Sequence, residues 1–240
     1  MSAVTESSIV IEGRFNGPPG SGNGGYTCGV LAKLLGDGPA EVALRAPPPL
    51  DRPLKVRMAA KEVSLYDGET LVGEGRSLET LDLQLQGVLE ADAGAAASEK
   101  YPWFEGHPFP TCFVCGPSRP AHDGLGIFTG QAGDDGLFGS TWTPAEEHAS
   151  SEGRVKPEIV WAALDCPTGL VALTEGEAVP GVLGTLAASI DAPLFAGEQH
   201  TITAWSLGVD GRKRAAAAVI SGPDGAVRAR SRALWIELKS

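Results

Sequence analysis

The same order of predicted elements occurs twice along the chain, and this repeat limits the fold more than any other feature. In the first half, residues 9–15 alternate as a strand does, and a glycine-rich turn leads to a short apolar helix that begins near Tyr26. Strand runs follow at residues 40–46, 54–66 and 70–81. Asp67-Gly68 is typical of a tight hairpin between the last two runs.

The second half repeats this order. Residues 136–142 predict a strand, and a helix follows from Pro157 to Asp165, since proline suits the first helical position. Four strand runs then complete the chain, at residues 184–194, 200–209, 214–221 and 226–238. One helix against an antiparallel sheet in each half is an α+β design, and 240 residues suffice for two such units.

We therefore predict an N-terminal domain over residues 1–85, a linker over 86–110 and a C-terminal domain over 111–240. The centre of the linker, residues 90–99, consists of small and polar residues with little to bury. The C-terminal domain starts with a lead-in segment that contains the pair Cys112-x-x-Cys115.

Charge and composition exclude several classes of function. The net charge of −11 repels phosphate backbones, so we expect no nucleic-acid partner. No run reaches the roughly 20 apolar residues that span a membrane. The first eight residues lack a signal-peptide pattern and the four cysteines are expected to be reduced, which predicts a cytoplasmic protein. We predict no cofactor, because no dinucleotide fingerprint or P-loop occurs.

Three short stretches resemble hotdog thioesterases, in which a curved antiparallel sheet wraps one central helix. Asn23-Gly-Gly-Tyr26 resembles the start of that helix, and Trp161–Gly169 resembles the helix that carries the catalytic carboxylate. Cys112-Phe-Val-Cys-Gly116, with Asp123-Gly-Leu125, resembles a segment ahead of the hotdog in small acyl-CoA thioesterases.

The two-part layout resembles the type II acyl-CoA thioesterases. The resemblance implies a tandem (double) hotdog that hydrolyses an acyl thioester, such as an acyl-CoA, to the free acid and CoA. Single hotdogs usually pair edge to edge, and a fused pair makes that dimer internally. A monomer and a homodimer of double hotdogs both remain open.

Thioester hydrolysis needs hydrogen-bond donors for the developing oxyanion and a base for water. The amides of Gly25 and Tyr26 are the predicted donors, because a helix N-terminus favours an anion and glycine lets a thioester approach. Asp165 is the predicted base, since its helix is apolar and burial raises the pKa of a carboxyl group. Glu158 lies on the same helix face as a second carboxylate, although an acid there also favours the helix dipole.

In type II enzymes the aspartate works with a Thr or Ser and a Gln. Asp165 matches the aspartate, Ser189 or Thr185 could match the hydroxyl, and Arg232 stands where the glutamine is expected. The resemblance also implies substrate contacts from Asn23, Gly24, Trp161, Thr168 and Arg232. Residues 212–214 and the arginines at 228, 230 and 232 are either basic patches for CoA or solvated surface residues.

The missing glutamine favours an alternative, a non-catalytic acyl-CoA or lipid-binding protein, whereas Asp165 on an apolar helix argues against it. The spacing of His107, Cys112, Cys115 and His122 could supply four zinc ligands, but one CxxC is a weak signal and we predict no metal. Cys28 and Cys166 are interpreted as packed core residues rather than nucleophiles.

Overall fold

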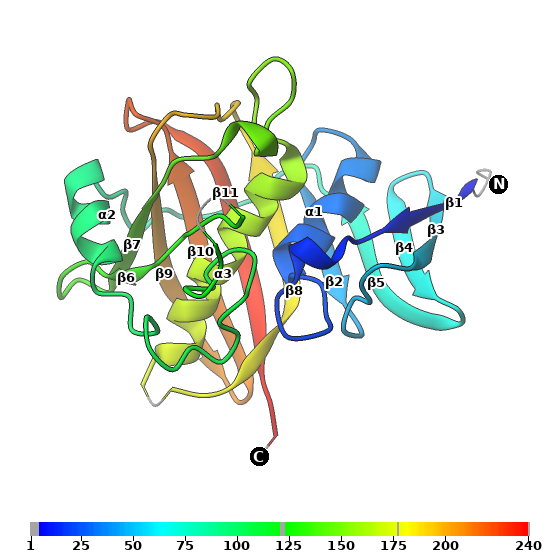
Figure 1. Ribbon diagram of the computed structural model, residues 1–240, viewed down its shortest axis with the longest axis horizontal. Coiled ribbons are helices and arrows are strands. Elements are labelled where there is room, and N and C mark those ends of the chain that lie inside the picture. Colours follow the sequence, from blue (N-terminus) through cyan, green and yellow to red (C-terminus); the bar gives the residue numbers. More distant parts are fainter. Residues whose placement is uncertain (1–4, 121–122, 177, 240) are drawn as a thin grey trace.

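A computed structural model describes residues 5–120, 123–176 and 178–239 as one 11-stranded antiparallel sheet with two long helices beside each other on one face (Figure 1). The first half contains β1 (Thr5–Val10), α1 (Gly24–Leu35), β2 (Ala40–Leu44), β3 (Pro53–Ala59), β4 (Glu62–Asp67) and β5 (Thr70–Ser77). The second contains α2 (Ala91–Ser98), β6 (Gly130–Gln131), β7 (Leu137–Trp142), α3 (Pro157–Thr174), β8 (Gly181–Ile190), β9 (His200–Asp210), β10 (Lys213–Ser221) and β11 (Val227–Glu237).

The strand order shows that the two halves are built alike. The sheet runs β1-β3-β4-β5-β2 through the first half and β8-β11-β10-β9-β7-β6 through the second. Counted outward from the centre, β2, β5, β4, β3 and β1 correspond to β8, β11, β10, β9 and β7. The halves join where β2 pairs with β8, from Ala40 opposite Ala188 to Ala43 opposite Thr185. The repeat of elements predicted from the sequence is thus present in the topology.

Helices α1 and α3 pack antiparallel and very close, because glycines of α1 face α3. A Cβ added at Gly25 would lie 2.4 Å from the Cβ of Asp165, and one added at Gly29 would lie 2.6 Å from the Cα of Glu158. Each helix also packs on its own half of the sheet, with Leu31 and Leu164 fully buried. The centre of the molecule is therefore a contact between the two halves.

Helix α3 continues to Thr174, so the predicted end at Asp165 is wrong. Pro167 lies inside the helix, where a proline costs about 3 kcal/mol. The buried side chains of Leu170, Val171 and Leu173 in the added turns offset this cost, at about 1.5–3 kcal/mol for each fully buried large apolar side chain. Tertiary burial thus overrides a local stop signal.

The predicted linker has more structure than its composition indicates. It contains α2, whose Gly94 would bring a Cβ within 3.2 Å of the Ser140 carbonyl oxygen. Ahead of α2, Leu89 packs with a second apolar cluster, formed by Leu137, Trp205, Ala217 and Val219 on the sheet face turned away from α3. The segment therefore covers the outer face of the second half-sheet.

Two predicted strands also differ from the strands in the structure. The run 54–66 is a hairpin of β3 and β4 that turns at Ala60, which has φ of 47°, and no Gly, Asn or Asp marks that turn. The run 9–15 ends as a strand at Val10, and Gly13–Phe15 forms a 3-10 turn. Within the described parts of the chain, no helix is long and apolar enough to cross a membrane.

The helix contact predicts the effect of Gly29→Ala. Alanine is the better helix former, yet the added methyl group would collide with the α3 backbone, so we expect the free energy of unfolding to fall by about 1–3 kcal/mol. Urea denaturation measures this change. Gly38→Ala is the control, since a Cβ there meets nothing within 4 Å, and should change stability by less than about 0.5 kcal/mol. Equal or greater stability of Gly29→Ala would contradict this packing.

Candidate active site

Asp165 is a buried carboxylate at the contact between the two halves. It lies in α3 and is 1% exposed. Its Oδ2 accepts hydrogen bonds from the Gly25 amide at 2.8 Å and from Asn23 Nδ2 at 3.2 Å. Its Oδ1 is buried without a hydrogen-bond partner among the described residues. One oxygen therefore anchors the group, and the other remains unpaired.

Burial raises the pKa of Asp165 from 3.8 to about 7, although the hydrogen bonds from Gly25 and Asn23 oppose the shift. A group with this pKa takes up and releases a proton near neutral pH. That is the range in which a general base works best.

The first turn of α1 uses two of its amides inside the protein. Asn23 caps the helix, and its Oδ1 accepts a hydrogen bond from the Tyr26 amide at 2.8 Å. The Gly25 amide is bound to Asp165. Both predicted oxyanion donors are therefore occupied in this structure. Gly24 is the first residue of α1, and its N–H has no hydrogen-bond acceptor among the described residues.

A cavity of about 370 Å³ brings these groups together, a size typical of small-molecule sites. Asn23, Gly24 and Asp165 lie in its wall. Apolar side chains form much of the rest of the wall: Leu44, Phe109, Leu173, Leu183 and Trp235. The cavity thus combines a free amide and a carboxylate with apolar walls.

A second cavity, of about 550 Å³, occupies the corresponding place in the other half. It lies at the start of α3 and beside the later part of α1. Here the first residue of the helix is Pro157 instead of Gly24. Eight residues after the helix start, α1 has Ala32 where α3 has Asp165. Proline has no N–H, and alanine has no carboxylate. At these two corresponding positions, only the first cavity has an N–H and a carboxylate.

The other predicted residues of α3 lie outside the Asp165 cavity. The Thr168 hydroxyl donates to the Asp165 carbonyl at 2.6 Å and accepts from the Trp235 indole N–H at 3.0 Å. Trp161 packs against Gly29 and lines the second cavity instead. Glu158 pairs with Lys33 at 3.2 Å.

Ser189 and Arg232 are not brought to the Asp165 cavity. The Ser189 hydroxyl donates to Asp191 at 2.7 Å, and the Arg232 side chain is 51% exposed, 4.0 Å from Glu41. Thr185 is likewise absent from the cavity wall. The basic patches are largely paired with acids: Arg214 with Glu237, Arg228 with Asp224 and Arg230 with Asp191.

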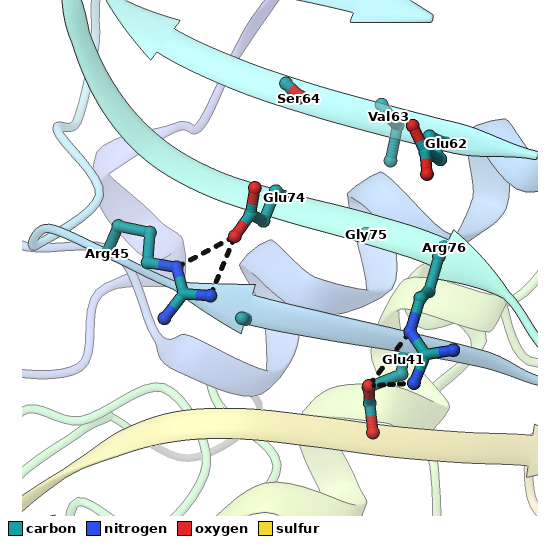
Figure 2. Close-up of a pocket in the computed structure, with 9 residues that line it drawn as sticks. Glu41, Arg45, Glu62, Val63, Ser64, Glu74, Gly75 and Arg76 are labelled. Carbon is teal, nitrogen blue, oxygen red and sulfur yellow. Dashed lines mark hydrogen bonds and ion pairs between the residues drawn. The ribbon is translucent and has the colours of Figure 1, made fainter. Parts of the chain in front are cut away.

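A hollow of about 210 Å³ on the first half of the sheet is dominated by its own ion pairs. Figure 2 shows Arg45 against Glu74 and Arg76 against Glu41, each at 2.7 Å. These charges satisfy one another, and the wall is mostly polar. Its arginines are thus paired with glutamates of the same wall.

Two features of the cavity were not predicted from the sequence. Gly24 was expected only as a substrate contact, although its place ahead of Gly25 at the helix start could have indicated the free amide. Cys112, Cys115 and Cys166 also lie in the cavity wall. Cys166 follows Asp165 directly, which was the one local sign of its position.

Solved structures share this architecture. The tesB protein of Mycobacterium avium subs paratuberculosis matches 98% of this chain and 93% of its own with a TM-score of 0.65 and 7% identity. A protein described as "oleoyl thioesterase (putative)" from Lactobacillus plantarum matches 100% of this chain and 98% of its own, with a TM-score of 0.60 and 10% identity. The chain has the hotdog-like fold of these thioesterases. No family model and no curated protein sequence matches it.

The raised pKa of Asp165 predicts a pH-dependent stability change for Asp165→Asn. The folded state binds an extra proton between pH 3.8 and about 7, so wild-type stability falls as pH rises through that window. Asparagine does not titrate in this range, so the variant does not lose stability in this way. We therefore expect its stability relative to wild type to rise by roughly 2–3 kcal/mol from pH 5 to pH 8 in urea denaturation.

Glu69→Gln is the control, because Glu69 is exposed in the turn between β4 and β5. Its stability relative to wild type should be the same at both pH values. An equal difference between Asp165→Asn and wild type at pH 5 and pH 8 would contradict a raised pKa at Asp165.

Proposed function

We propose that the protein is a tandem hotdog thioesterase that hydrolyses an acyl thioester such as an acyl-CoA. One observation carries the proposal: a buried carboxylate with one unpaired oxygen shares an apolar-walled cavity with a free helix N-terminal amide. The names of the tesB protein and the oleoyl thioesterase, which have the same fold, support this reaction class.

The tandem arrangement is supported by the matching strand orders of the two halves. In this proposal residues 1–85 and 111–240 form the two hotdog units, each with one long helix on its sheet. Residues 86–110 connect them. A cytoplasmic location and a homodimer of double hotdogs stay predictions.

The reaction follows from the positions of Asp165 and Gly24. Asp165 Oδ1 takes a proton from a water molecule, and the water oxygen attacks the thioester carbonyl carbon. The carbonyl oxygen becomes negative and accepts a hydrogen bond from the Gly24 N–H, at the positive end of α1. The C–S bond then breaks, and the thiolate takes up the proton that Asp165 removed from water. The carboxylic acid and the free thiol leave.

Asn23 acts as a positioning residue in this scheme. Its amide nitrogen donates to Asp165 Oδ2, and its amide oxygen accepts from the Tyr26 amide. It therefore fixes the carboxylate and the first turn of α1 with one side chain. The apolar wall formed by Leu173, Leu183 and Trp235 is the proposed contact for the acyl group.

Asp165→Asn tests the base. We expect kcat for acyl-CoA hydrolysis to fall at least about tenfold, since the amide cannot accept the proton. Wild-type kcat/KM should rise with pH and level off above about 7, because only the ionised carboxylate acts. A screen of thiol release over acyl-CoA chain lengths measures both.

Ser189→Ala is the control, because that hydroxyl lies outside the cavity, and its kcat should match wild type. Loss of turnover in Ser189→Ala, or full turnover in Asp165→Asn, would contradict the assignment. Acyl-CoA binding without thiol release by the wild type would favour the alternative, a non-catalytic acyl-CoA or lipid-binding protein.

Gly24→Pro tests the amide donor. Proline is accepted at the first position of a helix, and Asn23 already has the extended backbone, φ −61° and ψ 134°, that a following proline requires. Lys156-Pro157 has nearly the same geometry, with φ −62° and ψ 138° at Lys156. We expect kcat to fall roughly 10²–10³-fold, the typical loss for one oxyanion donor.

Gly24→Ala is the matched control for this change. It adds the same Cβ next to Leu183 but keeps the N–H, so kcat should stay well above that of Gly24→Pro. Equal losses in the two variants would show that crowding rather than the missing N–H is responsible.

A further inference from the structure

Three cysteines from two distant segments meet beside the Asp165 cavity. Cys112 and Cys115 belong to the lead-in segment before β6, and Cys166 belongs to α3. Their sulfur atoms all lie within 4.8 Å of one another, and the Sγ atoms of Cys112 and Cys166 are 3.8 Å apart. All three residues are free thiols that line the cavity.

One of the sulfur–sulfur distances matches a tetrahedral thiolate site. With zinc–sulfur bonds of about 2.3 Å and tetrahedral angles, two thiolates on one zinc ion lie about 3.8 Å apart. The Cys112–Cys166 distance has this value. A CxxC pair plus a third cysteine from another element is also a common way to hold zinc.

Neighbouring N–H groups point at these sulfurs. The Phe109 amide donates to His107 Nδ1 at 2.7 Å, so the proton of the neutral ring is on Nε2, which lies 3.4 Å from Cys115 Sγ. Asn23 Nδ2 lies 3.9 Å from both Cys112 Sγ and Cys166 Sγ. Such donors stabilise metal-bound thiolates from outside the ligand set.

We propose that Cys112, Cys115 and Cys166 bind a zinc ion whose fourth ligand comes from the cavity, such as a water molecule or a substrate thiol. Zinc is the choice because three thiolates favour a borderline-soft ion that prefers tetrahedral geometry. The ion ties the lead-in segment to α3 next to Asp165 and thereby positions that residue.

This proposal changes the zinc hypothesis of the sequence analysis. His107 donates to a cysteine ligand instead of binding the ion, and Cys166 takes a place that the spacing assigned to a histidine. His122 lies outside the described residues.

Metal analysis of the full-length wild-type protein tests the proposal. Protein purified under reducing conditions without chelators should contain about one equivalent of zinc, and removal of the metal followed by cobalt(II) titration should produce a thiolate-to-cobalt charge-transfer band. Cys166→Ser should weaken zinc binding at least about tenfold in competition with a chromophoric chelator. Cys28→Ser is the matched control, because Cys28 is buried in α1 outside the cluster, and should bind zinc like wild type.

Wild-type protein with less than about a tenth of an equivalent of zinc and no charge-transfer band would overturn the proposal. So would equal zinc loss in Cys28→Ser and Cys166→Ser, or a Cys112–Cys166 disulfide in protein kept reduced. The cobalt spectrum needs no variant and no turnover, so its outcome is independent of variant folding and of the thioesterase assays.

Discussion

The close approach of α1 and α3 is the contact on which the candidate site depends. Because Gly25 has no side chain, the Asp165 carboxylate reaches the first turn of α1 and accepts its amide at 2.8 Å. The acid comes from the second half of the chain, and the amides come from the first. Neither half contains the site alone, so the joined sheet that holds the two helices together is a condition for the proposed chemistry.

The duplicated architecture is symmetric, but its chemistry is not. Both helices start after a residue with nearly the same extended backbone, Asn23 in one half and Lys156 in the other. The next residue is Gly24 in the first case and Pro157 in the second, so only α1 keeps a free N–H there. Asp165 has Ala32 as its counterpart. In the proposed function, these two residue differences confine hydrolysis to one of the two cavities.

The cavity brings a buried carboxylate, an amide side chain and three cysteines together between apolar side chains. Burial raises the pKa of Asp165 to about 7, which lowers stability at neutral pH but leaves a carboxylate able to exchange protons there. Asn23 links this carboxylate to Cys112 and Cys166, so the proposed base and the proposed zinc site share one neighbour. A change at either site is therefore expected to affect the other.

The sequence by itself determined the repeated order of elements, the Asp67-Gly68 hairpin and the burial of Asp165, because periodicity, an Asp-Gly pair and an acid on an apolar helix are local signals. Only the tertiary structure decided that the Gly25 amide is bound by Asp165 of the other half. It also decided that α3 passes Pro167 and that Cys112 meets Cys166. These outcomes depend on packing between segments far apart in the chain, which no local pattern encodes.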